Sequence, residues 1–270
     1  MSAALPSDCH AYVLNLARAP QRLAAMQARL SALGVAFTRI EGVDGATLAA
    51  DALAALTRRN RYYKPLRPGE VGCYLGHVEA LRSFLASPAH FCLLLEDDAC
   101  FEDGFLPALA AALERRRAEA DPLCRWDVLK LCNRRRRWMP LAPLAAGHCL
   151  VEYGPSVPST TTAAVWTREG ATRFLAAFSG VSRPVDCDLQ HPWESGLRIL
   201  SVHPPVVSAE PVPSTIGGGK PRSRNPWPKL RYEALRLWPR WRHFSRLYGP
   251  LFWRRWRRGE GCPPLPDHRA

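Results

Sequence analysis

Apolar residues follow two different periods along the first 219 residues of the chain. Residues 11–16 form a mostly apolar run of strand length, and the apolar residues that follow, Leu23, Met26 and Leu30, recur at intervals of three and four, as on one face of a helix. Residues 35–40 return to a strand-like pattern. A strand-helix-strand unit of this kind predicts two neighbouring parallel strands.

The same alternation continues further along the chain. A second helix is predicted to start at Pro68, with apolar positions at helical spacing from Val71 to Leu85, and residues 91–95 form the uninterrupted apolar run expected of a central strand. Further strands are predicted at 127–132, 148–153, 162–166 and 197–203, and further helices at 105–119 and 168–178. The pattern predicts an α/β fold with a single mixed, mostly parallel sheet flanked by helices.

Positive charge and tryptophan are concentrated after residue 219. The chain of 270 residues has a formal net charge of +13, and 14 of its 37 Lys and Arg residues, but only 3 of its 24 Asp and Glu residues, lie in residues 220–270. Five of the nine tryptophans also lie there, after three glycines at 217–219. We therefore expect a nearly neutral domain over 1–219 and a basic, aromatic tail over 220–270.

Cysteine usage and hydropathy argue against a secreted or membrane-spanning protein. The nine cysteines include no CxxC pair, which indicates reduced thiols rather than a disulfide framework or a zinc site. The sequence contains no apolar run of about 18 residues and its N-terminus lacks the pattern of a signal peptide. We expect a cytoplasmic protein.

Three carboxylates, Glu96, Asp97 and Asp98, follow directly after the predicted central strand. Ligands of open α/β sheets gather at the carboxyl ends of the strands, and adjacent carboxylates repel one another unless a cation binds them. Oxygen ligands suit Mg²⁺ or Mn²⁺, and either ion can neutralise a diphosphate leaving group. The alternative is an acidic turn that caps the next helix.

Several segments, in this order, resemble glycosyltransferase family 25, which contains bacterial lipooligosaccharide galactosyltransferases and collagen galactosyltransferases. They are YVLNLARAPQR at 12–22, RIEGVDG at 39–45, RPGEVGCYLGH at 67–77, LLLEDDACF at 93–101, TTTAAVWTREGA at 160–171, RPVDCDL at 183–189 and HPPVVSAEPVPSTIG at 203–217. The third and fourth segments are the most specific. Gly76 departs from the family, whose members usually have Ser before the His.

The resemblance implies a GT-A type nucleotide-sugar-binding fold over 1–219 and a transfer that inverts the anomeric carbon. It implies UDP-galactose as donor, a divalent cation (Mn²⁺ or Mg²⁺) as cofactor, and a lipopolysaccharide, lipooligosaccharide or other surface glycan as acceptor. By similarity, Asp98 and Glu96 would bind the metal. The residues implied to contact the donor are Asn15, Arg18, Arg22, Asp44, Glu70, His77, Glu96 and Asp97. For Arg18 and Arg22 an ordinary helix-surface role is the alternative, and for His77 a structural role.

Inversion requires a carboxylate that takes the proton of the attacking hydroxyl group. Asp186 matches the acidic position of the corresponding family motif, and Asp188 is the nearest alternative. Glu194, which follows Trp193, is a further candidate. Loop solvation or helix capping is the structural alternative for all three carboxylates.

The tail alternates arginines with large aromatic and aliphatic residues at helical spacing from Trp227 onward. Such a helix can lie on an anionic membrane surface, so we expect peripheral association with the inner face of the cytoplasmic membrane, where lipid-linked acceptors are made. Nucleic-acid binding is the rival interpretation, and packing of the aromatic face on the domain is the third. A nucleic-acid-binding protein and a catalytically silent glycan-binding relative are the alternatives to an enzyme.

Overall fold

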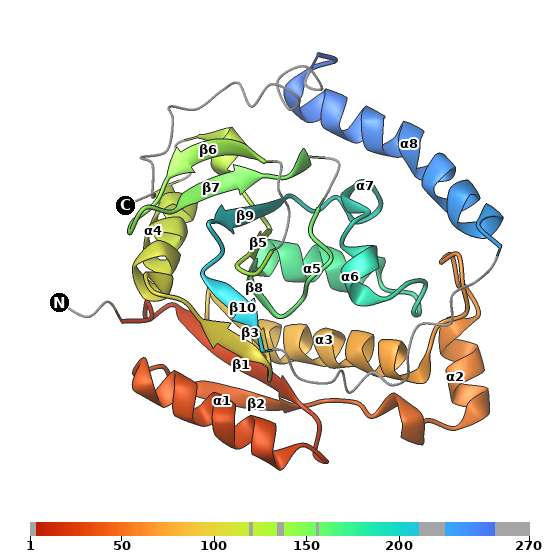
Figure 1. Cartoon of the computed structure of the whole chain (residues 1–270), viewed down its shortest axis with the longest axis horizontal. Helices are drawn as coiled ribbons and strands as arrows, with labels where there is room; N and C mark the ends of the chain where they lie inside the picture. Colours follow the sequence, from red (N-terminus) through yellow and green to blue (C-terminus); the bar gives the residue numbers. More distant parts are fainter. Residues whose placement is uncertain (1–3, 119–120, 134–137, 155–156, 211–224, 252–270) are drawn as a thin grey trace.

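A central eight-stranded sheet with helices on both faces organises the molecule (Figure 1). The computed structural model describes residues 4–118, 121–133, 138–154, 157–210 and 225–251. In spatial order the strands are β2 (Phe37–Glu41), β1 (Cys9–Asn15), β3 (Phe91–Glu96), β8 (Ala163–Thr167), β5 (Val128–Lys130), β9 (Ile199–His203), β7 (Cys149–Glu152) and β6 (Met139–Pro143). The α/β architecture predicted from the sequence is confirmed.

Strand direction differs from the prediction. The pairs β1–β2, β1–β3 and β5–β9 are parallel, whereas β3–β8, β8–β5, β9–β7 and β7–β6 are antiparallel. The expectation of a mostly parallel sheet is wrong, because β8 enters between β3 and β5 in the opposite direction and β6 and β7 pair as neighbours in the chain. Antiparallel pairs need no crossover helix, and the apolar pattern of a buried strand does not record its direction.

A second, two-stranded sheet pairs β4 (Ala99–Phe101) with β10 (Val207–Ala209), so the expectation of a single sheet is also wrong. Strand β4 follows directly after Asp98, and the backbone N–H of Glu210 donates to the carbonyl oxygen of Asp98 at 2.8 Å. The small sheet therefore fixes the turn that carries the acidic triplet.

The central strand β3 is buried on both faces, as its apolar run predicts. Leu93 and Leu95 belong to one core cluster and Cys92 and Leu94 to another. Helices α1 (Pro20–Ala32) and α4 (Phe105–Ala118) supply apolar residues to the first cluster, and α3 (Pro68–Ala86) and α5 (Arg168–Ala177) supply them to the second.

The start of α3 packs closely against the turn after β2, which continues into the short helix η1 (Gly45–Thr47). A Cβ on Gly45 would lie 1.7 Å from the carbonyl oxygen of Pro68, and a Cβ on Gly72 would lie 2.2 Å from that of Val43. Only glycine permits this backbone approach. The segments 39–45 and 67–77 therefore lie against each other.

The remaining helical elements are α2 (Ala50–Thr57), η2 (Pro122–Cys124), α6 (Val185–Asp188), α7 (Pro192–Ser195) and α8 (Trp227–Tyr248). Helix α8 runs along the periphery of the molecule beside α7 (Figure 1). Among the helices described, none combines the length and apolarity that a bilayer span requires. The predicted glycine junction at 217–219 and the end of the tail after 251 lie outside the described residues.

Candidate active site

The acidic triplet lies at the carboxyl end of β3, in the turn between β3 and β4. The side chains of Glu96, Asp97 and Asp98 are 26%, 11% and 22% exposed. Glu96 and Asp98 are therefore partly covered by protein but still open to solvent, as a ligand site requires, whereas Asp97 is buried.

Asp97 points toward the N-terminal strand and helix. Its Oδ2 accepts a hydrogen bond from Asn15 Nδ2 at 2.7 Å, and its Oδ1 lies 2.5 Å from the guanidinium of Arg22. Arg22 also lies 3.7 Å from Asp98 Oδ2. The structure thus brings the sequence-predicted residues Asn15, Arg22 and Asp97 together, with Arg22 as a counter-charge to the triplet.

Asp98 keeps one carboxylate oxygen without a partner. Its Oδ1 is buried and has no hydrogen bond within the described part of the chain. Burial, together with the charge of Glu96, raises the pKa of Asp98 to about 6, although Arg22 opposes the shift. A buried carboxylate with an unused oxygen and a raised pKa favours a bound cation or proton.

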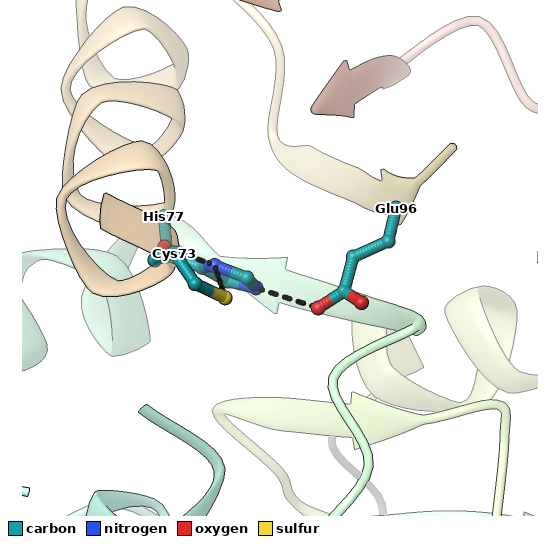
Figure 2. A group of neighbouring side chains, drawn as sticks. All are labelled: Cys73, His77 and Glu96. Carbon is teal, nitrogen blue, oxygen red and sulfur yellow. Dashed lines mark hydrogen bonds and ion pairs between the residues drawn. The ribbon is translucent and has the colours of Figure 1, made fainter. Parts of the chain in front are cut away.

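Cys73, His77 and Glu96 form a compact group whose ligand atoms all lie within 4.8 Å of one another (Figure 2). His77 Nδ1 donates to the carbonyl oxygen of Cys73 at 3.0 Å, which leaves Nε2 as the unprotonated nitrogen, facing Glu96 Oε1 at 3.7 Å. Nε2 is buried and has no hydrogen-bond partner among the residues that the structure describes. Burial is the main cause that lowers the pKa of His77 to about 4, so the imidazole is neutral and can act as a ligand.

Glu96 is held in place by Thr161, whose hydroxyl group donates to Oε1 at 2.6 Å. Burial raises the pKa of Glu96 against this hydrogen bond, and the charges of Asp186 and Asp97 add to the shift. A nearby positive charge would therefore stabilise the ionised carboxylate of Glu96.

The chemistry of these donors fits a divalent cation. Carboxylate oxygens of Glu96 and Asp98 and the free Nε2 of His77 are ligands for Mn²⁺ or Mg²⁺, and the orphaned Nε2 and Asp98 Oδ1 are the atoms that such an ion would satisfy. The Cys73 thiol lies in the same group, but burial raises its pKa well above the usual range, so it is protonated and a poor ligand for these ions. Asp98 lies outside the three-residue group, so its predicted metal role stays a prediction.

Asp186, at the start of α6, lies within electrostatic reach of this group. Its charge acts on Glu96, His77 and Lys130. Asp186 Oδ1 accepts the backbone N–H of Cys187 at 2.8 Å, and burial raises its pKa while the charge of Lys130 lowers it. The structure therefore places the predicted base close to the acidic triplet but on a separate element.

Lys130 is a residue that sequence analysis missed. It is fully buried in β5, and its Nζ donates at 2.6 Å to the carbonyl oxygens of both Pro158 and Thr160. These bonds fix the segment that leads to Thr161, the hydrogen-bond donor to Glu96. The signal was a single lysine in the apolar run DVLKLC, because a lysine is rarely buried without a partner.

The missed Cys73 had a signal as well. Cys73 and His77 are four residues apart on one helix, a spacing that places both side chains on the same face, although the sequence analysis found no zinc pattern. Thr161 carried no comparable signal, since its contact with Glu96 arises only from the pairing of β3 with β8.

The two alternative bases are engaged in other contacts. Asp188 accepts hydrogen bonds from the Tyr74 hydroxyl group at 2.7 Å and from Arg183 at 2.8 Å. Glu194 forms an ion pair with Arg183 at 2.8 Å. Both carboxylates thus pair with the buried Arg183, which makes Asp186 the stronger candidate.

The other sequence-predicted donor contacts lie in local pairs. Arg18 forms an ion pair with Asp44 at 2.6 Å, and Asp44 also caps η1 by accepting the N–H of Ala46. Glu70 accepts the N–H of Arg67 at 2.9 Å and so stabilises the start of α3. These contacts explain the residues structurally, and their roles toward a donor stay predictions.

The fold and the site define an α/β protein with an acidic, cation-compatible centre at the end of its central strand. Residues 8–132 match the model of glycosyltransferase family 25 (LPS biosynthesis protein). The resemblance drawn from the sequence motifs is confirmed, and this part of the chain is similar to glycosyltransferase family 25.

Curated relatives agree with the family model. A glycosyltransferase 25 family member of Aedes aegypti is 30% identical over 133 residues, which are 47% of this chain and 21% of the relative. A probable inactive glycosyltransferase 25 family member 3 of Rattus norvegicus is 34% identical over 110 residues, 38% of this chain and 19% of the relative. The chain therefore matches about a fifth of the length of these relatives.

One solved structure aligned with the chain is a mutant of Drosophila beta-1,4-galactosyltransferase 7, in complex with manganese, UDP-Gal and xylobiose. It is 12% identical, with a TM-score of 0.35, and the alignment covers 74% of this chain and 70% of the other. A similarity at this level does not define a shared fold.

Proposed function

We propose that the protein is a metal-assisted, inverting glycosyltransferase with a GT-A type donor site, and that it moves galactose from UDP-galactose to a lipopolysaccharide-type or other surface glycan. The observation that carries the proposal is the pairing of Glu96 with the unsatisfied Nε2 of His77, together with the unsatisfied Oδ1 of Asp98 two residues further along the chain. The charge of Asp186, on a separate element, reaches the same group. The match to the family model, whose description names LPS biosynthesis, supports the choice of acceptor class.

The proposed reaction assigns separate roles to the two sides of the site. Glu96, His77 and Asp98 would hold a divalent cation, which supplies positive charge to the diphosphate as it leaves. Arg22 lies beside Asp97 and Asp98, where its guanidinium can also contact a phosphate oxygen.

Asp186 serves as the base. The oxygen of the acceptor hydroxyl group attacks the anomeric carbon, the bond from that carbon to the diphosphate oxygen breaks, and the hydroxyl proton passes to the Asp186 carboxylate. UDP leaves with the bonding electrons. Because burial raises the pKa of Asp186, this carboxylate is a better proton acceptor than an exposed aspartate.

A catalytically silent relative is the second candidate, since the curated relatives include a protein named as probably inactive. A transfer assay with UDP-sugars and a panel of glycan acceptors separates the two. We expect turnover that EDTA abolishes, that Asp186→Asn reduces by about two orders of magnitude or more, and that Glu194→Gln largely retains. Donor binding without turnover across the panel would favour the silent relative.

A further inference from the structure

We propose that the outer face of α8 docks on an anionic lipid bilayer. This face is defined by the exposed apolar residues Trp227, Leu230, Leu237, Trp238 and Trp241 and by a flanking row of basic residues, Arg231, Arg242 and Arg246. The proposal does not depend on the catalytic assignment, because it concerns a surface remote from the acidic triplet in sequence and made by a single helix.

The inner face of α8 is attached to the body along most of the helix. The Tyr232 ring lies 5.6 Å from that of Tyr62 and 5.8 Å from that of His191, and Tyr232 and Phe244 are buried. Near the end of the helix, the Tyr248 hydroxyl group donates to Glu152 Oε2 at 2.8 Å. Packing on the domain, an alternative from the sequence, therefore accounts for one face only.

The outer face exposes an unusual amount of large apolar surface. Trp227 is 74% exposed, Trp238 65% and Leu237 62%, and Trp238 stacks on Trp241 with ring centroids 5.1 Å apart. Residues eleven apart, such as Trp227 and Trp238, face the same direction after three helical turns. Contiguous exposed apolar surface of this kind marks a binding site.

Basic side chains border this apolar strip. Arg231 and Arg242 are also eleven residues apart, and with Arg246 they lie on the neighbouring side of the same exposed face. None of the three forms an ion pair within the described ranges. The one carboxylate of the helix, Glu233, is paired with Arg236 and Arg240 instead. Positive charge on the outer face is therefore not neutralised by any carboxylate that the structure describes.

The combination fits a bilayer surface better than a nucleic acid. Exposed leucines gain nothing from stacking on bases but are stabilised among acyl chains, tryptophans favour the headgroup region, and arginines bind lipid phosphates. Helix α8 is also attached to the segment that follows α6, and, if the proposed function holds, this attachment links the membrane surface to the acceptor side of the site. Arg236 contacts Gln190 and Tyr232 contacts His191, four and five residues after Asp186, so a docked helix would hold the acceptor side near the membrane.

Vesicle co-sedimentation of the full chain tests the proposal. We expect binding to vesicles of phosphatidylcholine mixed with phosphatidylglycerol, weak binding to phosphatidylcholine alone, and a decrease with salt. Trp238→Ala with Trp241→Ala should lower the binding constant at least roughly tenfold, and Arg231→Gln with Arg242→Gln should lower it roughly thirtyfold. The matched controls, Leu123→Ala and the pair Arg58→Gln with Arg82→Gln, alter exposed residues of other elements and should bind as the parent does.

Three outcomes would overturn the proposal. The first is equal binding of the α8 variants and the parent, since the residues after 251 would then carry any association. The second is self-association in sedimentation velocity that the tryptophan pair abolishes, which would assign the face to a second copy. The third is α8-dependent binding of a single-stranded oligonucleotide without vesicle binding. Circular dichroism of each variant confirms that the fold is retained, and none of these readouts requires sugar transfer.

Discussion

The Nε2 atom of His77 faces the Oε1 atom of Glu96 at 3.7 Å, and Nε2 is buried with no hydrogen-bond partner in the described part of the chain. This distance is too long for a hydrogen bond, and the lowered pKa of His77 removes the charge that would make it an ion pair. Two acceptors facing each other across a short gap are stabilised by a cation between them.

Substitutions of Cys73, His77 and Glu96 distinguish a site for Mn²⁺ from a thiolate site for Zn²⁺. His77→Ala and Glu96→Gln should each weaken Mn²⁺ binding by about tenfold or more, because each removes a ligand, whereas Cys73→Ser should change it by less than about threefold. Titration calorimetry with MnCl₂ measures all three variants. A large loss for Cys73→Ser, together with tighter binding of Zn²⁺ than Mn²⁺ by the parent, would show that the site is a thiolate site instead.

Lys130 is predicted to act as a positioning residue. Lys130→Met leaves the carbonyl oxygens of Pro158 and Thr160 without their buried donor and should lower the free energy of unfolding by about 1–3 kcal/mol. It also removes the positive charge that lowers the pKa of Asp186, so the acidic limb of the turnover-pH profile should move to higher pH.

A pH profile separates these two effects for Lys130. Denaturant unfolding gives the stability change, and transfer rates across a pH series give the position of the acidic limb. A loss of stability with an unshifted profile would mean that Lys130 supports the segment 157–162 but does not influence Asp186.

Two glycines of α3 provide a matched pair. Gly72→Ala should destabilise the protein by about 1–3 kcal/mol, because the added Cβ would lie 2.2 Å from the carbonyl oxygen of Val43. Gly76→Ala should be neutral or slightly stabilising, since its nearest contact is 3.5 Å away and alanine favours a helix. Urea unfolding of both variants checks the difference, and equal effects would contradict the close approach of α3 to the 42–45 turn.

Acid should weaken the attachment of α8 through His191. Burial, with the charges of Arg183 and Arg236, lowers the pKa of His191 to about 3, and its Nε2 accepts a hydrogen bond from the Tyr232 hydroxyl group. Below about pH 6.5 the unfolded chain binds a proton at His191 that the native state does not bind. The free energy of unfolding therefore decreases by about 1.4 kcal/mol for each unit by which the pH is lowered.

Asp98 opposes this trend, because its raised pKa makes the native state bind a proton more readily than the unfolded chain between its usual pKa and about 6. The variant His191→Gln isolates the histidine. Unfolding free energies at about pH 7 and about pH 5 should show a smaller decrease for the variant than for the parent. Identical decreases would exclude His191 as a source of the acid sensitivity.

The sequence predicted those parts of the structure that depend on local pattern. The apolar run 91–95 predicted a strand buried on both faces, and Pro68 predicted the start of α3. The placement of Glu96, Asp97 and Asp98 at a strand end followed from the same run. These features depend on neighbours in the chain, which the sequence records directly.

Features that depend on long-range pairing were missed. The antiparallel β8 brings Thr161 to Glu96, and β5 brings Lys130 within electrostatic reach of Asp186, although about 55 residues or more separate the partners of each pair in the chain. The short strands β4 and β10 have too few residues to show a period. Hydrophobic periodicity indicates that a strand is buried but not which strand lies next to it.

The central claim is that Glu96 and its neighbours hold a cation that binds the diphosphate of a nucleotide sugar. Calorimetric titration of UDP-galactose into the parent and into Glu96→Gln, each with and without Mn²⁺, tests it most directly. We predict that the parent binds the donor at least about tenfold more tightly with Mn²⁺ than without it, and that Glu96→Gln loses this difference. Donor affinity that is the same in all four titrations would contradict the account.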